Sequence, residues 1–193
     1  MGIDAKQSLV YVQPAGRGDV LPAGVSTDTV VTRSGRYKAF VIMPFVERNP
    51  VRSEGFFKEV YRSLIEPAAK AAGFEVDWAN KSGSDIIQST IINEVLDADL
   101  LIADLSDHNP NVLFELGLRL AYNKGPTALI KSQDTGRLFD VDNLVRVYEY
   151  KPTLWKSSLD IDIPNLEEHI RATWDNRDKN DTYLNILRRR SDR

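Results

Sequence analysis

A short apolar segment that runs into a polar turn and a helix start constrains the fold of this chain more than any other feature. Residues 100–103 are consecutive apolar side chains, as expected for a strand that is covered on both faces. Asn109 is a favourable N-cap, and Pro110 follows at the first helical position, where its missing N–H costs nothing. We therefore predict a buried strand over 100–105, a polar turn, and a helix from 110 to about 124.

The same alternation of strand and helix extends over residues 37–150. Such an alternation is typical of a parallel sheet with helices packed on both faces. The fold class predicted is therefore α/β, a flavodoxin-like open parallel sheet of about five strands with helices on both faces. The strands are expected at 37–43, 74–78, 100–105, 127–130 and 144–150, and the helices at 54–72, 85–97 and 110–124.

Composition shifts divide the chain into three parts. Residues 1–36 are rich in Gly, Pro, Ser, Thr and Asp and predict an N-terminal extension that is partly flexible. Residues 37–150 form the α/β domain. Residues 151–193 carry two expected helices, 159–175 and 181–190, which we expect to pack on that domain.

Charge and residue content exclude several functional classes. Acidic residues exceed basic ones by 28 to 25, which gives no general case for nucleic-acid binding. The chain has no cysteine and two histidines, so disulfides and thiolate chemistry are excluded and no metal site is predicted. No signal peptide is recognised, and no apolar run approaches the ~20 residues of a membrane span. We expect a soluble, cytoplasmic protein without a membrane partner.

Polar side chains gather where the predicted central strand ends and the next helix begins. In an open α/β sheet, ligands bind beyond the carboxyl ends of the strands. Two interpretations of Asp104 and Asp107 stand side by side, as catalytic or ribose-binding groups and as loop and capping residues. The residues expected to line one wall of a crevice are Asp104, Ser106, Asp107, Asn109, Asn111 and Glu115.

Three motifs resemble a known superfamily. They are Met43-Pro44-Phe45 after the first strand, ADLLIADLS at 98–106, and NPNVLFELG at 109–117. Together they resemble the nucleoside 2-deoxyribosyltransferase-like proteins, which are structurally related to TIR domains. The likeness covers roughly residues 38–150.

The resemblance implies roles for particular residues. Glu115 matches the glutamate that attacks the anomeric carbon in the transferases, and a glutamate at a comparable place is required by TIR domains that cleave NAD. Pro44 and Phe45 match a segment that lines the base pocket, although the family's glycine is Met43 here. The family's aspartate six residues before the nucleophile is Asn109, so Asp104 or Asp107 would have to assist departure of the base.

The function expected is therefore cleavage, by hydrolysis or transfer, of an N-glycosidic bond in a nucleotide, nucleoside or NAD. Glu115 would be the nucleophile or would stabilise an oxocarbenium-like state. Ser106, Asn109 and Asn111 would help to bind the substrate. No cofactor is expected, and NAD would enter as a substrate. The alternative is a non-catalytic TIR-like module that binds a nucleotide signal or self-assembles, with a defence role implied by the same resemblance.

The helix that carries Glu115 also admits a purely structural interpretation. Glu115 and Arg119 lie four residues apart and would form an ordinary ion pair on a helix surface. On a helical wheel Glu115 lies opposite the apolar face formed by Leu113, Leu116, Gly117, Leu120 and Ala121. A second apolar stripe, Phe114, Leu118 and Tyr122, predicts either a homo-oligomer through the 110–124 helix or burial under the C-terminal helices.

Overall fold

The computed structural model describes residues 36–79, 87–122, 125–137 and 146–177, which belong to one compact unit, Arg36–Arg193. The predicted N-terminal extension lies outside the described residues except for Arg36. The predicted helix at 181–190 and the first two residues of the predicted 85–97 helix also lie outside them.

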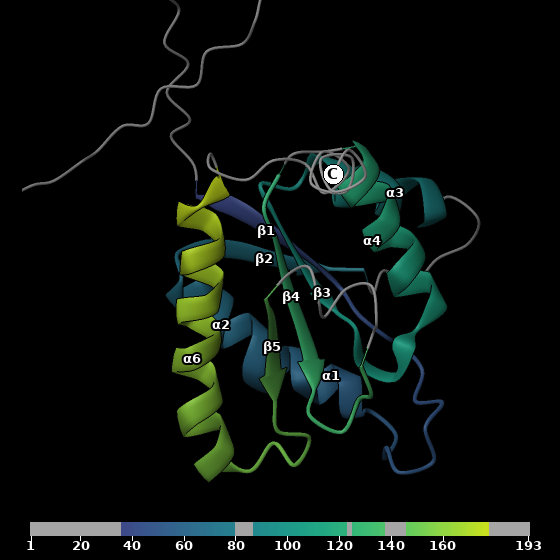
Figure 1. Cartoon of the computed structure of the whole chain (residues 1–193), viewed down its shortest axis with the longest axis vertical. Coiled ribbons are helices and arrows are strands. Elements are labelled where there is room, and N and C mark those ends of the chain that lie inside the picture. The colour runs from purple at the N-terminus through teal and green to yellow at the C-terminus, as the bar shows by residue number, and fades with distance from the viewer. Residues whose placement is uncertain (1–35, 80–86, 123–124, 138–145, 178–193) are drawn as a thin grey trace, which may run out of the picture. The chain divides into compact units, whose positions relative to one another are not determined.

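Five parallel strands form one open sheet in the order β2-β1-β3-β4-β5 (Figure 1). This is the doubly wound order of flavodoxin-like proteins, so the predicted fold class is confirmed. The strands are β1 (Tyr37–Ile42), β2 (Phe74–Trp78), β3 (Leu100–Asp104), β4 (Thr127–Ser132) and β5 (Val147–Tyr150).

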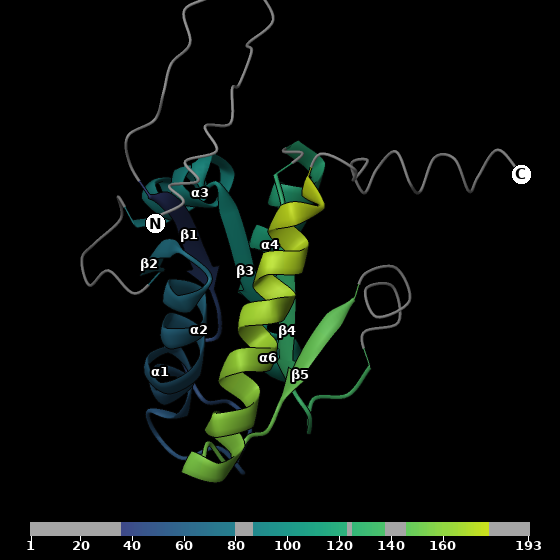
Figure 2. The same cartoon turned by 90° about the vertical axis from the view of Figure 1, so that its left-hand side faces the viewer.

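Helices cover both faces of the sheet (Figures 1 and 2). On one face lie α3 (Ile87–Asp97) and α4 (Pro110–Tyr122). On the other lie α6 (Lys156–Asp175) and a continuous helical segment made of α1 (Phe56–Val60), the π-helical turn η1 (Tyr61–Ile65) and α2 (Glu66–Ala71). The wide turn of η1 ends two residues before Pro67, which lacks the N–H that an α-helix would require there.

Each face of the sheet packs against its own hydrophobic core, and alternate residues of β3 supply both. Leu100 and Ile102 join the core under α1, α2 and α6. Leu101 and Ala103 join the core under α3 and α4. All of β3 is buried, which explains why its sequence is a continuous apolar run instead of an alternating one.

Several element bounds differ from the prediction by a few residues. Strand β1 ends at Ile42 and β3 at Asp104, each one residue early, whereas β4 continues two residues farther, to Ser132. Helix α6 begins at Lys156 instead of 159. The prediction ended β4 too early because Lys131 and Ser132 are polar and yet buried. A hydrophobic pattern does not detect such residues.

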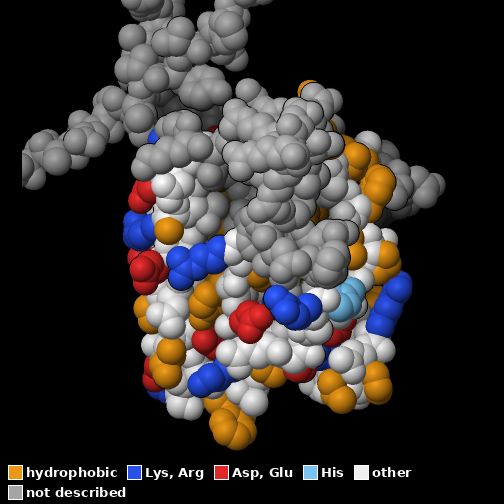
Figure 3. All heavy atoms as spheres, in the orientation of Figure 1, with side chains coloured by type: hydrophobic (Ala, Val, Ile, Leu, Met, Phe, Trp, Pro, Cys, Tyr) orange, Lys and Arg blue, Asp and Glu red, His pale blue; other side chains and the backbone are white. Residues whose placement is uncertain are grey.

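Two surface properties of the described part bear on function. No helix there is both long and apolar enough to cross a membrane. On the face shown in Figure 3, acidic and basic side chains lie interspersed and do not gather by sign.

Candidate functional site

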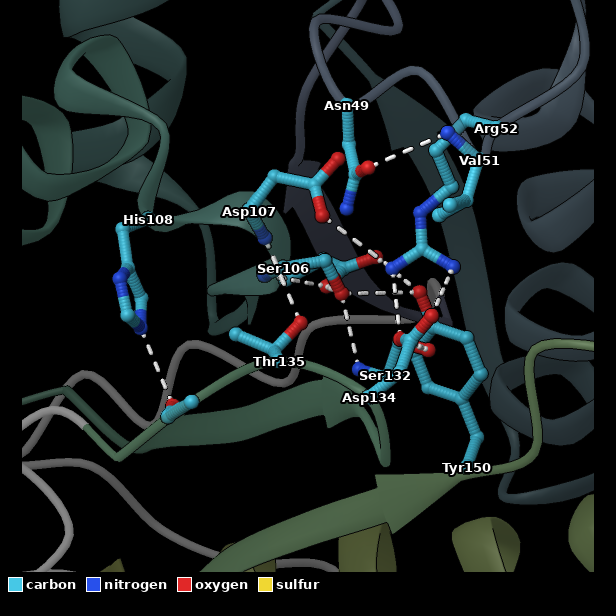
Figure 4. A network of polar contacts seen from close by, with 12 residues as sticks. Asn49, Val51, Arg52, Ser106, Asp107, His108, Ser132, Asp134, Thr135 and Tyr150 are labelled. Atoms are coloured by element: carbon cyan, nitrogen blue, oxygen red, sulfur yellow. Dashed lines mark hydrogen bonds and ion pairs between the residues drawn. The ribbon is translucent and has the colours of Figure 1, made fainter.

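The strand order fixes where a ligand site is expected. In a sheet ordered 2-1-3-4-5, the chain reverses direction of winding between β1 and β3, and ligands bind beyond the carboxyl ends of those strands. The segments that leave this edge are residues 43–55 after β1, 105–109 after β3 and 133–137 after β4. Figure 4 shows that the polar side chains from these three segments meet there.

Asp104 lies at the centre of a buried network that joins three strand ends. Its Oδ1 accepts hydrogen bonds from the Ser106 amide at 3.0 Å and from Ser106 Oγ at 2.6 Å. Its Oδ2 accepts a hydrogen bond from Tyr150 Oη, at the end of β5, at 2.9 Å. Ser106 Oγ in turn accepts from the Ser132 amide, at the end of β4, at 2.8 Å. Asp104 and Ser106 are fully buried, and their hydrogen bonds join the ends of β3, β4 and β5.

Burial raises the pKa of Asp104 to about 6, although the hydrogen bonds from Ser106 and Tyr150 and the charge of Arg52 oppose that rise. The carboxyl group is thus close to half protonated at weakly acidic pH. Asp104 is 0% exposed and cannot touch a ligand directly. Its role in this structure is to position Ser106 and Tyr150.

The turn after β3 places the other predicted residues. The one-turn 3₁₀ helix η2 (Ser106–His108) carries Asp107 and His108 at positive φ, 56° and 49°. Asn109 Oδ1 accepts from the Asn111 amide at 3.0 Å and from the Val112 amide at 3.4 Å, which confirms the predicted N-cap. His108 Nε2 contacts the Gly136 carbonyl at 3.0 Å, as a loop residue would. The Asn111 side chain is exposed at the start of α4.

Sequence reasoning missed three residues of the site: Arg52, Asp134 and Tyr150. Arg52 extends from the segment after β1, and its guanidinium binds both oxygens of Asp134, at 2.8 and 2.7 Å, and Asp107 Oδ1 at 3.2 Å (Figure 4). The guanidinium also lies over the Phe56 ring, 4.4 Å from its centroid, and Arg52 is only 8% exposed. A single arginine in a polar loop has no periodicity, so no pattern in the sequence predicts this burial.

Glu115 lies on the second turn of α4, where it is partly buried. The predicted wheel is correct for Leu113, Leu116 and Leu120, which pack on the core, but Gly117 and Ala121 are exposed, and Val112 and Arg119 are buried instead. At ~100° per residue, Glu115 therefore lies about 100° from the centre of the packed face and not opposite it. Burial raises the pKa of its carboxyl group to about 7.

The expected Glu115–Arg119 ion pair does not form. Arg119 is 0% exposed and turns inward, where it donates to the carbonyls of Val95, Leu96 and Ala98 at the end of α3. A cation at a helix C-terminus satisfies carbonyls that have no intrahelical partner. Among the described residues, no basic side chain neutralises Glu115, whose pKa responds to burial alone.

An aromatic cluster lies at the ends of β1 and β2. The Tyr61 and Trp78 rings stack with their centroids 4.5 Å apart, and the Phe45 ring packs at a tilt on Trp78 with its centroid 5.9 Å away. Phe45 is exposed whereas Pro44 is buried. Phe45 thus presents an exposed ring beyond the carboxyl end of β1, whereas Pro44 does not reach the surface.

No protein-family model matches the chain, and a search of the curated proteins found no match.

Proposed function

We propose that this protein cleaves an N-glycosidic bond in a nucleotide, nucleoside or NAD, by hydrolysis or transfer. The observation that carries the proposal is the state of Glu115. It is a partly buried carboxyl group with a pKa raised to about 7, on the helix that follows the central strand of a flavodoxin-like sheet. The motif resemblance assigns the nucleophile to the same residue.

The chemistry suits these groups. As the bond to the base breaks, positive charge develops on the sugar, and a carboxylate beneath it stabilises that charge or bonds to the anomeric carbon. Glu115 would take this role. Asp107, on the turn before α4, would face the substrate, whereas buried Asp104 would position the turn. Phe45 offers a ring on which a base would stack.

Base release tests the proposal directly. Full-length protein is incubated with NAD, the nucleoside monophosphates and the deoxynucleosides, with and without a second base as acceptor, and chromatography measures the free base. We expect release by the wild type and a loss of at least ~10³-fold in Glu115→Gln, since a nucleophile would be removed. Glu168→Gln, at an exposed position of α6, is the matched control and should retain full turnover. Equal rates in Glu115→Gln and wild type would exclude Glu115 as the nucleophile.

A second candidate function is a non-catalytic module that binds a nucleotide and self-assembles. The exposed stripe on α4 favours it, because Phe114 is 57% exposed and Tyr122 is 76% exposed. Saturable nucleotide binding with no released base from any substrate would favour this module over the enzyme.

A further inference from the structure

The cluster formed by Arg52, Asp107 and Asp134 contains two polar atoms that its internal contacts leave unused. Among the described residues, Arg52 Nε and Asp107 Oδ2 are buried and have no hydrogen-bond partner. Buried polar groups in proteins are nearly always paired, so each exception calls for a reason. Here a donor and an acceptor are left over on two side chains already in contact through Nη2 and Oδ1, at 3.2 Å.

The rest of the cluster fixes Arg52 firmly and Asp107 less firmly. Asp134 binds the guanidinium through two contacts of 2.7 and 2.8 Å, and the Phe56 ring lies against it. Asp134 is itself held by Ser132 Oγ at 2.5 Å. The contact to Asp107 is single and is the longest in the cluster. A ligand group would therefore enter most readily on the Asp107 side.

The charges of the cluster limit what that group is. One guanidinium faces two carboxylates, so the cluster carries a net charge of −1 when all three groups are ionised. Another anion, such as a phosphate, would be repelled by Asp107 and Asp134. A neutral hydroxyl meets both needs, since one oxygen accepts from Nε–H and donates to a carboxylate oxygen.

We propose that Arg52 and Asp107 form a binding site for a sugar 2′-hydroxyl, which makes the protein selective for ribose over 2′-deoxyribose. This inference rests on the proposed function, because it takes the sugar of the N-glycosidic substrate as the ligand. The 2′-hydroxyl adjoins the anomeric carbon, and hydrogen bonds to it strengthen as an oxocarbenium-like state forms. Asp107 accepts the hydroxyl hydrogen, and Arg52 donates Nε–H to the hydroxyl oxygen while it also holds the Asp107 carboxylate through Nη2.

Paired ligands test the site without relying on turnover. Calorimetry measures binding of the four nucleoside 5′-monophosphates and their 2′-deoxy counterparts to full-length Glu115→Gln protein. We expect the ribonucleotide of at least one pair to bind at least about tenfold more tightly. Adding Asp107→Asn should reduce that preference to less than about threefold. The fold should persist, because asparagine tolerates the positive φ at this position.

Two further variants separate binding from general damage. Arg52→Lys, added to Glu115→Gln, keeps the charge but loses the planar guanidinium. Its preference for ribose should lie between that of Glu115→Gln alone and that of Glu115→Gln with Asp107→Asn. Asp160→Asn, on the exposed face of α6, should leave the preference unchanged. Equal affinities within every pair, a preference that survives Asp107→Asn, or no nucleotide binding at all would each overturn the proposal.

The outcomes also separate this site from the proposed reaction. A ribose preference without base release would leave the hydroxyl site standing and remove the glycosidase. Base release at equal rates from ribo- and deoxyribonucleotides would support the glycosidase and remove the 2′-hydroxyl site.

Discussion

Asp104 illustrates how one buried carboxyl group shapes this edge of the sheet. When it is ionised, the Ser106 and Tyr150 hydroxyl hydrogens both point to it, and the 3.0 Å contact between the two hydroxyl oxygens has no hydrogen to share. When it is protonated, its own hydrogen reaches Tyr150, which then donates to Ser106. Every contact is then a hydrogen bond, in keeping with a pKa raised, through burial, to about 6.

The tyrosine hydroxyl should therefore matter to stability. Tyr150→Phe removes the donor to Asp104 Oδ2 within a fully buried network, and we expect the free energy of unfolding at pH 7 to fall by about 1–3 kcal/mol. Urea denaturation followed by circular dichroism measures the change. Tyr122→Phe, at an exposed position, is the control and should change nothing. An equal effect of both variants would show that the network adds no stability.

The pKa shifts of Asp104 and Glu115 also set a pH dependence. Both folded-state values, about 6 and about 7, lie above the ordinary values of 3.8 and 4.5. At these two groups the folded state thus binds more protons than the unfolded state, so their contribution to the free energy of unfolding falls as pH rises from about 4 to about 7.

Glu115→Gln tests the larger part of this dependence. Glutamine has no charge to bury, so the variant should match the wild type at pH 4 and exceed its stability at pH 8. After allowance for solvent screening at a partly exposed site, the gain at pH 8 is about 1–2 kcal/mol. Urea denaturation at the two pH values, followed by circular dichroism, measures it. Equal stability of the two proteins at pH 8 would show that the carboxylate is well solvated in the folded state.

At the scale of elements, Arg119 connects α3 with α4. Its three hydrogen bonds, of 2.9–3.0 Å, go to two carbonyls in the last turn of α3 and to that of Ala98 just after it, and they replace the ion pair with Glu115 that the sequence suggested. Arg119 thus belongs to the packed face of α4 together with Val112 and Leu116, and Glu115 lies on the flank of that face.

Replacing this cation should loosen both helices. Arg119→Met keeps an unbranched side chain but leaves three buried carbonyls without their donor, and we expect a loss of about 2–4 kcal/mol in the free energy of unfolding. Hydrogen exchange should speed up at the end of α3 before it does in β3. Arg62→Met, on the exposed side of η1, serves as the control. A loss below about 0.5 kcal/mol would show that other groups satisfy these carbonyls.

The elements were predictable to the extent that hydrophobic side chains alone determine them. The continuous apolar run of β3 and the Asn109 cap follow from residue type and spacing, and both are present. Arg52, Arg119 and Lys131 are charged residues that are buried. Pattern reasoning assigns charges to the surface, so it ended β4 too early, left Arg119 out of the packed face of α4 and missed Arg52 in the candidate site.

At the scale of the molecule, the two faces of the sheet are covered by different helices. Helix α6 contacts α2, η1, β4 and β5, on the face opposite α4. It therefore does not bury the stripe formed by Phe114, Leu118 and Tyr122, and the other C-terminal helix expected to cover that stripe, 181–190, lies outside the described residues. Contact of the stripe with a second copy of this chain stays a prediction.

Sedimentation velocity over a hundredfold range of concentration tests self-association. We expect the wild type to sediment as an oligomer and the double variant Phe114→Lys, Tyr122→Lys as a monomer, because charge in an apolar interface must lose its hydration. Trp155→Lys, at another exposed aromatic position, should leave the oligomer intact. A wild-type protein that is monomeric at every concentration would exclude an interface on α4.

The Asp104 network has a consequence for the order in which the protein is made. A chain emerges from the ribosome with its N-terminus first, and Tyr150 follows Asp104 by 46 residues. A nascent chain that has produced β1 to β4 therefore has a nearly complete sheet whose central carboxyl group still lacks its last donor. Because Asp134 also follows Arg52 by 82 residues, the contacts of the candidate site cannot all form until β4 and β5 have been synthesised.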